Sequence, residues 1–281
     1  AKDKAAADYL GDGDTAAAGD GDQVEINQAL TAGSGKKVVL LAGTYTIDAA
    51  ISVPNNTTLA GVGTGTLITI PNSFNTHINA ITNTTTGGNG TGITIRDLKL
   101  DGNKANQTSG TMYGVYFNGV GSGTGSSAVQ GGTITNVKAN NWRNSGIFLL
   151  SSSNNTITGN TTQGNTNYGI YLISSSHNTL TGNTAQGNTN YGIYLSSSSN
   201  NTLTSNTTQG NNYGIGLNSS SNNTITGNTT QGNTYGIFLA TSSSNNTITG
   251  NTAQGNTNYG IFLFSSSNNT ITGNTTQGTN T

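Results

Sequence analysis

A short sequence repeats from Asn144 to the end of the chain, and this repeat constrains the fold more than any other feature. Each copy contains Ile or Leu, then Thr, Gly or Ser, and Asn. These anchors start 23, 23, 22, 23 and 23 residues apart, at Ile157, Leu180, Leu203, Ile225, Ile248 and Ile271. A Gly-Ile pair recurs between them, at Gly146, Gly169, Gly192, Gly214, Gly236 and Gly260. A unit this short cannot bury a core alone, so the repeat predicts coils that stack on their neighbours.

Within each copy, apolar residues alternate with polar ones as in β-strands. Period two places Ile157 on one face and its two Thr neighbours on the other, and it separates Ile170 and Leu172 from Tyr171. A helical period is absent, and Gly and β-branched residues recur in every segment, which disfavours a helical solenoid. We therefore expect two buried columns. One holds the six anchors listed above, and the other holds Ile147, Ile170, Ile193, Ile215, Ile237 and Ile261.

The composition requires another source of order besides an apolar core. The chain is 31% hydrophobic and 7% charged, with a formal net charge of −1. Disordered chains combine low hydrophobicity with high net charge, so this neutral chain is better explained by stacking of identical side chains. We expect the Asn of each anchor to stack at a tight turn, with each amide bonded to the next along the axis. These residues are Asn160, Asn183, Asn206, Asn228, Asn251 and Asn274.

The repeated unit resembles that of a known superfamily. Gly-Ile-Tyr-Leu at 169–172 and Ser-Ser-Ser-Asn-Asn-Thr-Ile-Thr-Gly-Asn at 151–160 are similar to the repeats of pectin-lyase-like proteins, especially Asn-rich surface and periplasmic proteins of bacteria and archaea. The resemblance covers about half of the chain. It implies an all-β, right-handed parallel β-helix (a solenoid) and an extracellular or cell-surface location.

We expect one continuous domain, because no linker rich in Pro or charge divides the chain. Residues 1–60 form an N-terminal cap and the first coils, residues 61–143 form irregular coils with a Gly/Ser loop, and residues 144–281 form six regular coils. A short capping helix is expected around Val24–Leu30. The resemblance implies that Val24, Ile26 and Leu30 plug the first coil.

Every Asp, Glu, Lys and Arg lies at or before Arg143. Polysaccharide-cleaving or epimerising members of the superfamily use such residues on one face of the middle coils. The dense cluster here contains Asp97, Lys99 and Asp101, which alternation places on one outer face, whereas Arg96 lies apart from them. A solvated group of ion pairs is the preferred interpretation of this pattern, because surface charges commonly have no catalytic task. We expect no catalytic residue, and if the chain is an enzyme these three residues are the candidates.

Two Gly-Asp segments near the N-terminus contain acidic side chains that could surround Ca²⁺, an ion that prefers several oxygen ligands. They are Asp12, Asp14, Asp20 and Asp22. Their spacing does not match a twelve-residue Ca²⁺ loop, and Gly-Asp is also common in turns. His77 and His177 have no partner pattern. We therefore expect no metal or cofactor, with Ca²⁺ as the alternative.

Outward positions of the Gly-Ile-x-Leu segments form an aromatic ridge. Its members are Tyr116, Phe148, Tyr171, Tyr194, Phe238 and Phe262, with Gly216 in the fifth place. An exposed aromatic ridge is typical of a surface that stacks on glycans or packs against another subunit. A corner loop that covers the ridge is the alternative.

Some partners are excluded by composition. The nine Lys and Arg residues form no basic stripe, which argues against nucleic acid. No apolar run approaches about 18 residues, which argues against membrane insertion.

The first functional expectation is a non-enzymatic extracellular structural protein, whose subunits associate head-to-tail or laterally into a fibre, sheath or coat. The last copy continues through Thr281 without a capping helix or charged edge, and unprotected strand edges favour pairing. The alternative is a carbohydrate-binding or polysaccharide-degrading β-helix (lyase, epimerase or hydrolase). A third hypothesis is an ice-binding protein, which would use the Thr rows beside Ile157 and its equivalents.

Overall fold

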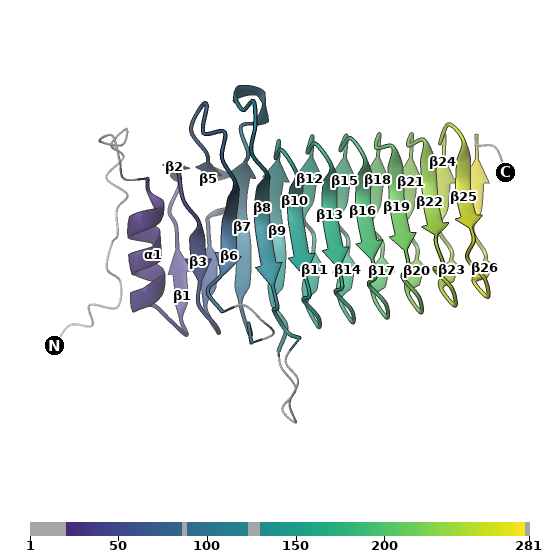
Figure 1. Cartoon of the computed structure of the whole chain (residues 1–281), viewed down its shortest axis with the longest axis horizontal. Helices are drawn as coiled ribbons and strands as arrows, with labels where there is room; N and C mark the ends of the chain where they lie inside the picture. Colours follow the sequence, from purple (N-terminus) through teal and green to yellow (C-terminus); the bar gives the residue numbers. More distant parts are fainter. Residues whose placement is uncertain (1–20, 86–88, 123–129, 279–281) are drawn as a thin grey trace.

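The computed structural model describes residues 21–85, 89–122 and 130–278. The chain winds into a tube whose coils follow one another along the long axis, from a helix at one end to the last strands at the other (Figure 1). Every strand pair in the described residues is parallel, and each pairs with the equivalent segment one coil away, as between Ile157 and Leu180. The predicted parallel β-helix is therefore confirmed.

One wall of the tube is a nine-stranded sheet, named sheet B, to which each coil contributes one strand. Its strands are β3 (Ile51–Val53), β6 (Ile78–Asn83), β8 (Met112–Asn118), β10 (Ser145–Leu150), β13 (Tyr168–Ile173), β16 (Tyr191–Ser196), β19 (Tyr213–Asn218), β22 (Tyr235–Ala240) and β25 (Tyr259–Phe264). They pair in this order along the axis, so equivalent residues of successive coils form continuous rows.

The remaining eighteen described strands form the rest of the tube and are named sheet A. The front coils contribute β1 (Lys37–Val39), β2 (Gly43–Thr46), β4 (Thr58–Ala60), β5 (Thr66–Thr69), β7 (Thr94–Asp101) and β9 (Thr133–Asn140). The regular coils contribute β11 (Thr156–Thr158), β12 (Thr161–Gln163), β14 (Thr179–Thr181), β15 (Thr184–Gln186), β17 (Thr202–Thr204), β18 (Thr207–Gln209), β20 (Thr224–Thr226), β21 (Thr229–Gln231), β23 (Thr247–Thr249), β24 (Thr252–Gln254), β26 (Thr270–Thr272) and β27 (Thr275–Gln277). Two 3₁₀ turns, η1 (Gly63–Gly65) and η2 (Lys104–Asn106), lie between front strands.

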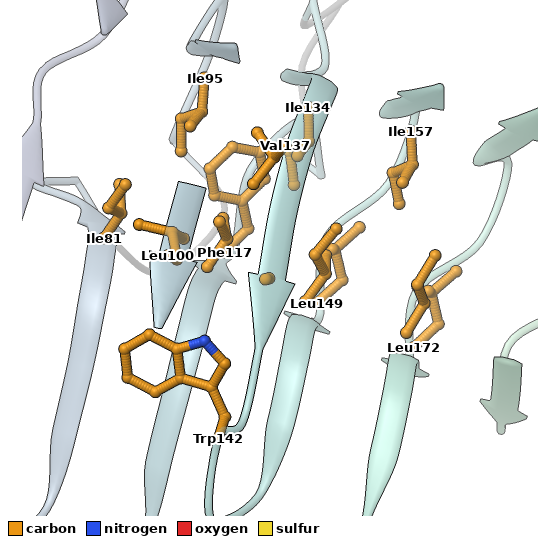
Figure 2. Close-up of a cluster of buried hydrophobic side chains, with 14 of the residues drawn as sticks. Ile81, Ile95, Leu100, Phe117, Ile134, Val137, Trp142, Leu149, Ile157 and Leu172 are labelled. Carbon is orange, nitrogen blue, oxygen red and sulfur yellow. The ribbon is translucent and has the colours of Figure 1, made fainter. Parts of the chain in front are cut away.

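The core is a narrow stack of side chains from both sheets. Figure 2 shows Ile134 and Ile157 of sheet A with Leu149 and Leu172 of sheet B, beside the buried Trp142. Both predicted columns are fully buried in the first five regular coils. These residues are Ile157, Leu180, Leu203, Ile225 and Ile248, with Ile147, Ile170, Ile193, Ile215 and Ile237. In the last described coil the exposed fraction of Ile271 rises to 44%, because no described coil covers it.

Buried Asn side chains form ladders parallel to the core, as predicted. Asn160 Nδ2 donates to Asn183 Oδ1 over 2.9 Å, and Asn183 Nδ2 donates to Asn206 Oδ1 over 2.9 Å. The same Oδ1 of Asn183 accepts the backbone N–H of Asn160 over 3.0 Å. Equivalent ladders start at Asn155 and Asn165. Because each buried amide is paired on both sides, these corners stay ordered without charged groups.

The predicted capping helix is α1 (Gln23–Ala32), which lies at the end of the tube (Figure 1). Ile26 and Leu30 are buried as expected, but the expectation for Val24 was wrong, because its exposed fraction is 36%. Residues four apart share a helix face, whereas Val24 lies on the opposite side from Ile26 and Leu30. The side chain of Asn27 accepts the N–H of Ser52 over 2.8 Å, so the helix pairs with the free edge of β3.

No helix in the described ranges is long and apolar enough to cross a membrane.

Candidate aromatic binding face

The predicted ridge residues lie in register on the outer side of sheet B. Tyr116 pairs with Phe148, Phe148 with Tyr171, and Tyr171 with Tyr194 along β8, β10, β13 and β16. Ring centroids of these pairs are 5.1, 4.9 and 5.3 Å apart. Phe238 and Phe262 continue the row, 5.7 Å apart. The structure thus brings together all six residues, although Phe148 is buried by its neighbours, with an exposed fraction of 6%.

A second row of rings lies beside the first, and period two did not predict it. Its members are Tyr113, Tyr168, Tyr191, Tyr213, Tyr235 and Tyr259. Strict alternation assigns Tyr168 to the same side as the inward Ile170, yet Tyr168 is half-buried on the outside and stacks on Tyr171 at 4.4 Å. Together the two rows form a surface that we name the aromatic face.

Gly169 explains why the Tyr row turns outward. Gly169 is buried between Tyr168 and Ile170, and the pairing to the next coil skips it. A Cβ at this position would lie 2.5 Å from the carbonyl oxygen of Gly192 and 2.5 Å from Thr162 Oγ1, so only glycine fits. The inward glycine interrupts the alternation. The sequence did contain a signal for this irregularity, the recurring Tyr-Gly-Ile of these strands, because glycine inside a strand often marks a break in the alternation.

The missing ring at Gly216 leaves no gap in the aromatic face. A Cβ at Gly216 would lie 2.4 Å from Cε1 of Tyr191, so the Tyr191 ring occupies the place of the absent side chain. Tyr191 also stacks on Tyr194 at 4.2 Å and on Tyr213 at 4.6 Å. The stack therefore continues across this coil.

Tyr116 meets Phe148 edge-on, but from Phe148 and Tyr168 onward the ring pairs within each row stack face to face along the axis. The solvent therefore meets mainly ring edges and phenolic hydroxyls. Within the described part of the chain, the hydroxyls of the second row from Tyr168 to Tyr259 take part in no hydrogen bond. Desolvation by burial raises the pKa of Tyr171 to about 12, and it also raises the pKa of Tyr191 above the ordinary value. The hydroxyls of Tyr171 and Tyr191 therefore remain protonated at neutral pH.

The charged cluster lies on sheet A, a different wall from the aromatic face. Asp97, Lys99 and Asp101 all project outward from β7, as predicted. The expected separation of Arg96 from Asp97 was wrong, because Arg96 Nη1 contacts Asp97 Oδ2 at 2.7 Å. Asp97 has a φ of 55°, and this left-handed residue interrupts the alternation, so Arg96 and Asp97 both face outward while Leu98 is buried.

Other groups already engage both carboxylates of the cluster. Asp97 Oδ1 accepts from Asn136 Nδ2 over 3.1 Å. Asp101 lies 3.7 Å from Lys99 Nζ, and its Oδ1 accepts the N–H of Asn103 over 2.9 Å. Asp101 also lines an open pocket at the ends of β2, β5 and β7, with Thr46 and Thr69. Both ion pairs lie within β7, whereas the hydrogen bond from Asn136 to Asp97 joins this strand to β9 of the next coil.

The candidate Ca²⁺ residues Asp12, Asp14 and Asp20 lie outside the described residues. The carboxylate of Asp22 accepts the N–H of Thr46 over 2.5 Å. Among the residues that the structure describes, no group of three or more His, Asp or Glu side chains is placed to hold a metal ion. The ring of His77 contacts Tyr113 edge-on at 6.1 Å, at the front of the aromatic face.

Solved structures with the same fold include polysaccharide enzymes and a phage tailspike. The A-module of the mannuronan C-5 epimerase AlgE6 from Azotobacter vinelandii is 18% identical, with a TM-score of 0.51, and the match covers 92% of this chain and 95% of that one. An exopolygalacturonase from Thermotoga maritima is 12% identical, with a TM-score of 0.64, over 87% of this chain and 73% of that one. The enzymatically active domain of tailspike protein 2 from bacteriophage CBA120 is 16% identical, with a TM-score of 0.72, over 89% of this chain and 40% of that one.

At these identities the likeness establishes the fold alone. No curated protein matches the chain by sequence. The family described as "Right handed beta helix region" matches residues 113–276, which is more than half of the chain and includes all the regular coils up to Thr276. Together with the parallel coils and the stacked columns, this match shows that the chain belongs to the right-handed β-helix family.

Proposed function

We propose that this protein binds an extended, uncharged polysaccharide along its aromatic face, at an extracellular or cell-surface location. The observation that carries the proposal is the row of unpaired phenolic hydroxyls set against a continuous stack of rings, from Tyr168 to Tyr259. A sugar chain offers both C–H groups and hydroxyls, so it suits a surface that is apolar and hydrogen-bonding at once.

The geometry favours a linear ligand. The aromatic face repeats once per coil, at about 4.8 Å, and six such steps from β8 to β25 give a strip about 29 Å long. Ring edges carry partial positive charge, so the exposed edges attract the lone pairs of sugar oxygens. The phenolic hydroxyls add hydrogen-bonding groups at the same spacing. A glycan that lies along the strip therefore meets a similar set of contacts in every coil.

Charge favours a neutral glycan over a polyuronate. No Lys or Arg follows Arg143, so the regular coils offer no cation to a bound carboxylate. An anionic sugar would lose part of its hydration at the aromatic face without an opposite charge in return, which is unfavourable. The solved structures above are named for a mannuronan epimerase and an exopolygalacturonase, and this supports a polysaccharide ligand in general.

The same aromatic face supports a second candidate function, lateral self-association into a fibre, sheath or coat. Half-buried rings such as Tyr194 and Phe238 offer apolar area that a second copy could cover. The unpaired tyrosine hydroxyls favour the glycan, because packing against another aromatic face would bury them without partners. Light scattering at high protein concentration distinguishes the two functions, since glycan binding requires no oligomer.

Affinity electrophoresis tests the proposal. Gels cast with soluble β-glucan, mannan or xylan should retard the protein, whereas gels with polygalacturonate or alginate should not. Tyr168→Phe combined with Tyr191→Phe keeps the rings but removes two hydroxyls, and the affinity should fall about tenfold at about 0.5–1.5 kcal/mol for each hydrogen bond. Tyr45→Phe is the matched control, because its hydroxyl already donates to the carbonyl of Leu41 away from the aromatic face. Equal retardation of the double variant and the control would contradict the proposal.

A further inference from the structure

One corner of the regular coils presents a row of Asn side chains in the same left-handed conformation. This corner follows the sheet B strand of each coil and precedes β11, β17, β20, β23 and β26. The row consists of Asn154, Asn200, Asn222, Asn245 and Asn268, with φ values of 58°, 58°, 58°, 58° and 56°. His177 occupies the equivalent position in the second coil, with a φ of 59°.

Each Asn of this row begins the sequence Asn-Asn-Thr, and both its first and third residues are exposed. The third residues are Thr156, Thr202, Thr224, Thr247 and Thr270. Asn-x-Thr is the acceptor sequence for N-linked glycosylation, which requires an accessible side chain. Within the described residues the amides of Asn200, Asn222, Asn245 and Asn268 make no side-chain hydrogen bond. Asn154 differs, because its Nδ2 donates to the carbonyl of Gly121 over 2.8 Å.

A second set with the same motif is sequestered by the fold. Asn160, Asn206 and Asn228 each begin Asn-Thr-Thr, but all three are fully buried. The Nδ2 of Asn206 donates to the carbonyl of Leu180 and to Oδ1 of Asn228, both over 2.9 Å. The fold thus exposes the Asn-Asn-Thr acceptors of the corner row and buries these three Asn-Thr-Thr acceptors, whereas Asn274 of the last described coil is half-buried.

We propose that Asn200, Asn222, Asn245 and Asn268 are the sites at which the folded chain accepts N-linked glycans. The co-reactant is an oligosaccharide linked to a polyprenyl pyrophosphate. The Nδ2 forms a bond to the anomeric carbon, the bond from that carbon to the pyrophosphate oxygen breaks, and the amide loses one proton. Adjacent acceptors lie about 4.8 Å apart, so neighbouring coils cannot both carry bulky glycans. Occupancy of this row should therefore alternate and stay below four glycans.

The test treats the purified, folded chain with a single-subunit oligosaccharyltransferase and its lipid-linked donor. Intact mass then counts the glycans per chain. Peptide N-glycosidase in ¹⁸O water marks each modified Asn as labelled Asp, and chymotryptic fragments locate the label. Trypsin is unsuitable because no Lys or Arg follows Arg143. A synthetic peptide of residues 204–210 is the positive control, because it contains the Asn206 motif free of the fold.

The expected result is label on Asn200, Asn222, Asn245 and Asn268, none on Asn206 or Asn228, and glycosylation of the control peptide. Thr202→Ala should abolish the label at Asn200, whereas Thr204→Ala, an outward Thr of the same strand that lies outside any acceptor motif, should not. His177→Asn should add a new site in the second coil. Label on the buried Asn set of the folded chain, or an unlabelled exposed row beside a glycosylated peptide, would overturn the proposal.

Discussion

Asn160 and Asn183 lie 23 residues apart in the sequence, yet the side chain of Asn183 accepts both the side-chain amide and the backbone N–H of Asn160, over 2.9 and 3.0 Å. A single amide thereby completes the hydrogen bonding of a corner in the preceding coil. The same relationship repeats along the tube to Asn274. The Asn side chains thus join neighbouring coils, and the hydrogen bonding of each Asn corner depends on the Asn of the next coil.

The Asn ladder predicts that loss of a buried ladder Asn lowers stability more than loss of an exposed polar residue in the same coil. Asn183→Ala removes the partner of two buried donors on Asn160, and each buried unsatisfied group costs about 1–3 kcal/mol. We expect the free energy of unfolding to fall by about 2–6 kcal/mol in urea denaturation. Gln186→Ala, at an exposed position of β15, is the control and should change stability little. An equal loss in both variants would mean that the ladder does not stabilise the coil.

The core column predicts a larger effect at Ile225. Ile225→Asp places an unpaired carboxylate in a fully buried position, which should lower the free energy of unfolding by several kcal/mol. Thr226→Asp, the outward neighbour on β20, should be far milder. Thermal unfolding followed by circular dichroism measures both. Retention of the full melting temperature by Ile225→Asp would refute the inward register.

The aromatic face predicts a loss of stability at high pH. Burial raises the pKa of Tyr171 to about 12, from the ordinary value of 10.0, so the folded chain holds its phenolic proton more tightly than the unfolded chain. Below pH 10 both states are protonated and this contribution to stability is complete. Between pH 10 and about 12 the unfolded state releases the proton first, so the free energy of unfolding falls as the pH rises.

Urea denaturation at several pH values measures this dependence, and phenolate absorbance follows the titration. Tyr171→Phe should make the decline above pH 10 shallower, because it removes one shifted group. A curve for Tyr171→Phe as steep as that of the unmodified chain would contradict the assignment.

The charged cluster is predicted to have a structural rather than a catalytic role. The unmodified protein should release no oligosaccharides from polygalacturonate, alginate or neutral glycans, as measured by reducing ends. Asp101→Asn should lower stability by under about 1 kcal/mol, because the pair with Lys99 is partly solvated. Turnover by the unmodified chain that Asp97→Asn, Lys99→Met or Asp101→Asn abolishes would instead assign catalysis to this cluster.

The sequence by itself determined the coil and its repeating contacts. A constant spacing puts the same residue at the same place in each coil, so Ile157 stacks on Leu180 and Asn160 on Asn183 without knowledge of any other contact. Stacking of like residues is a property of the period, and the period is visible in the amino acids. The amphipathic stretch likewise predicted α1, apart from the side of the helix on which Val24 lies.

Only the tertiary structure decided which side chains face outward after an irregular residue. The inward Gly169 turns Tyr168 to the surface, and the left-handed backbone of Asp97 brings Arg96 to its carboxylate. It also decided that Asn200 is exposed while Asn206, with the same acceptor motif, is buried. The physical reason is that alternation holds only while the backbone stays extended. A single residue that departs from it reverses the side chains on one side of it relative to those on the other within the same strand, and that departure depends on contacts with the neighbouring coil.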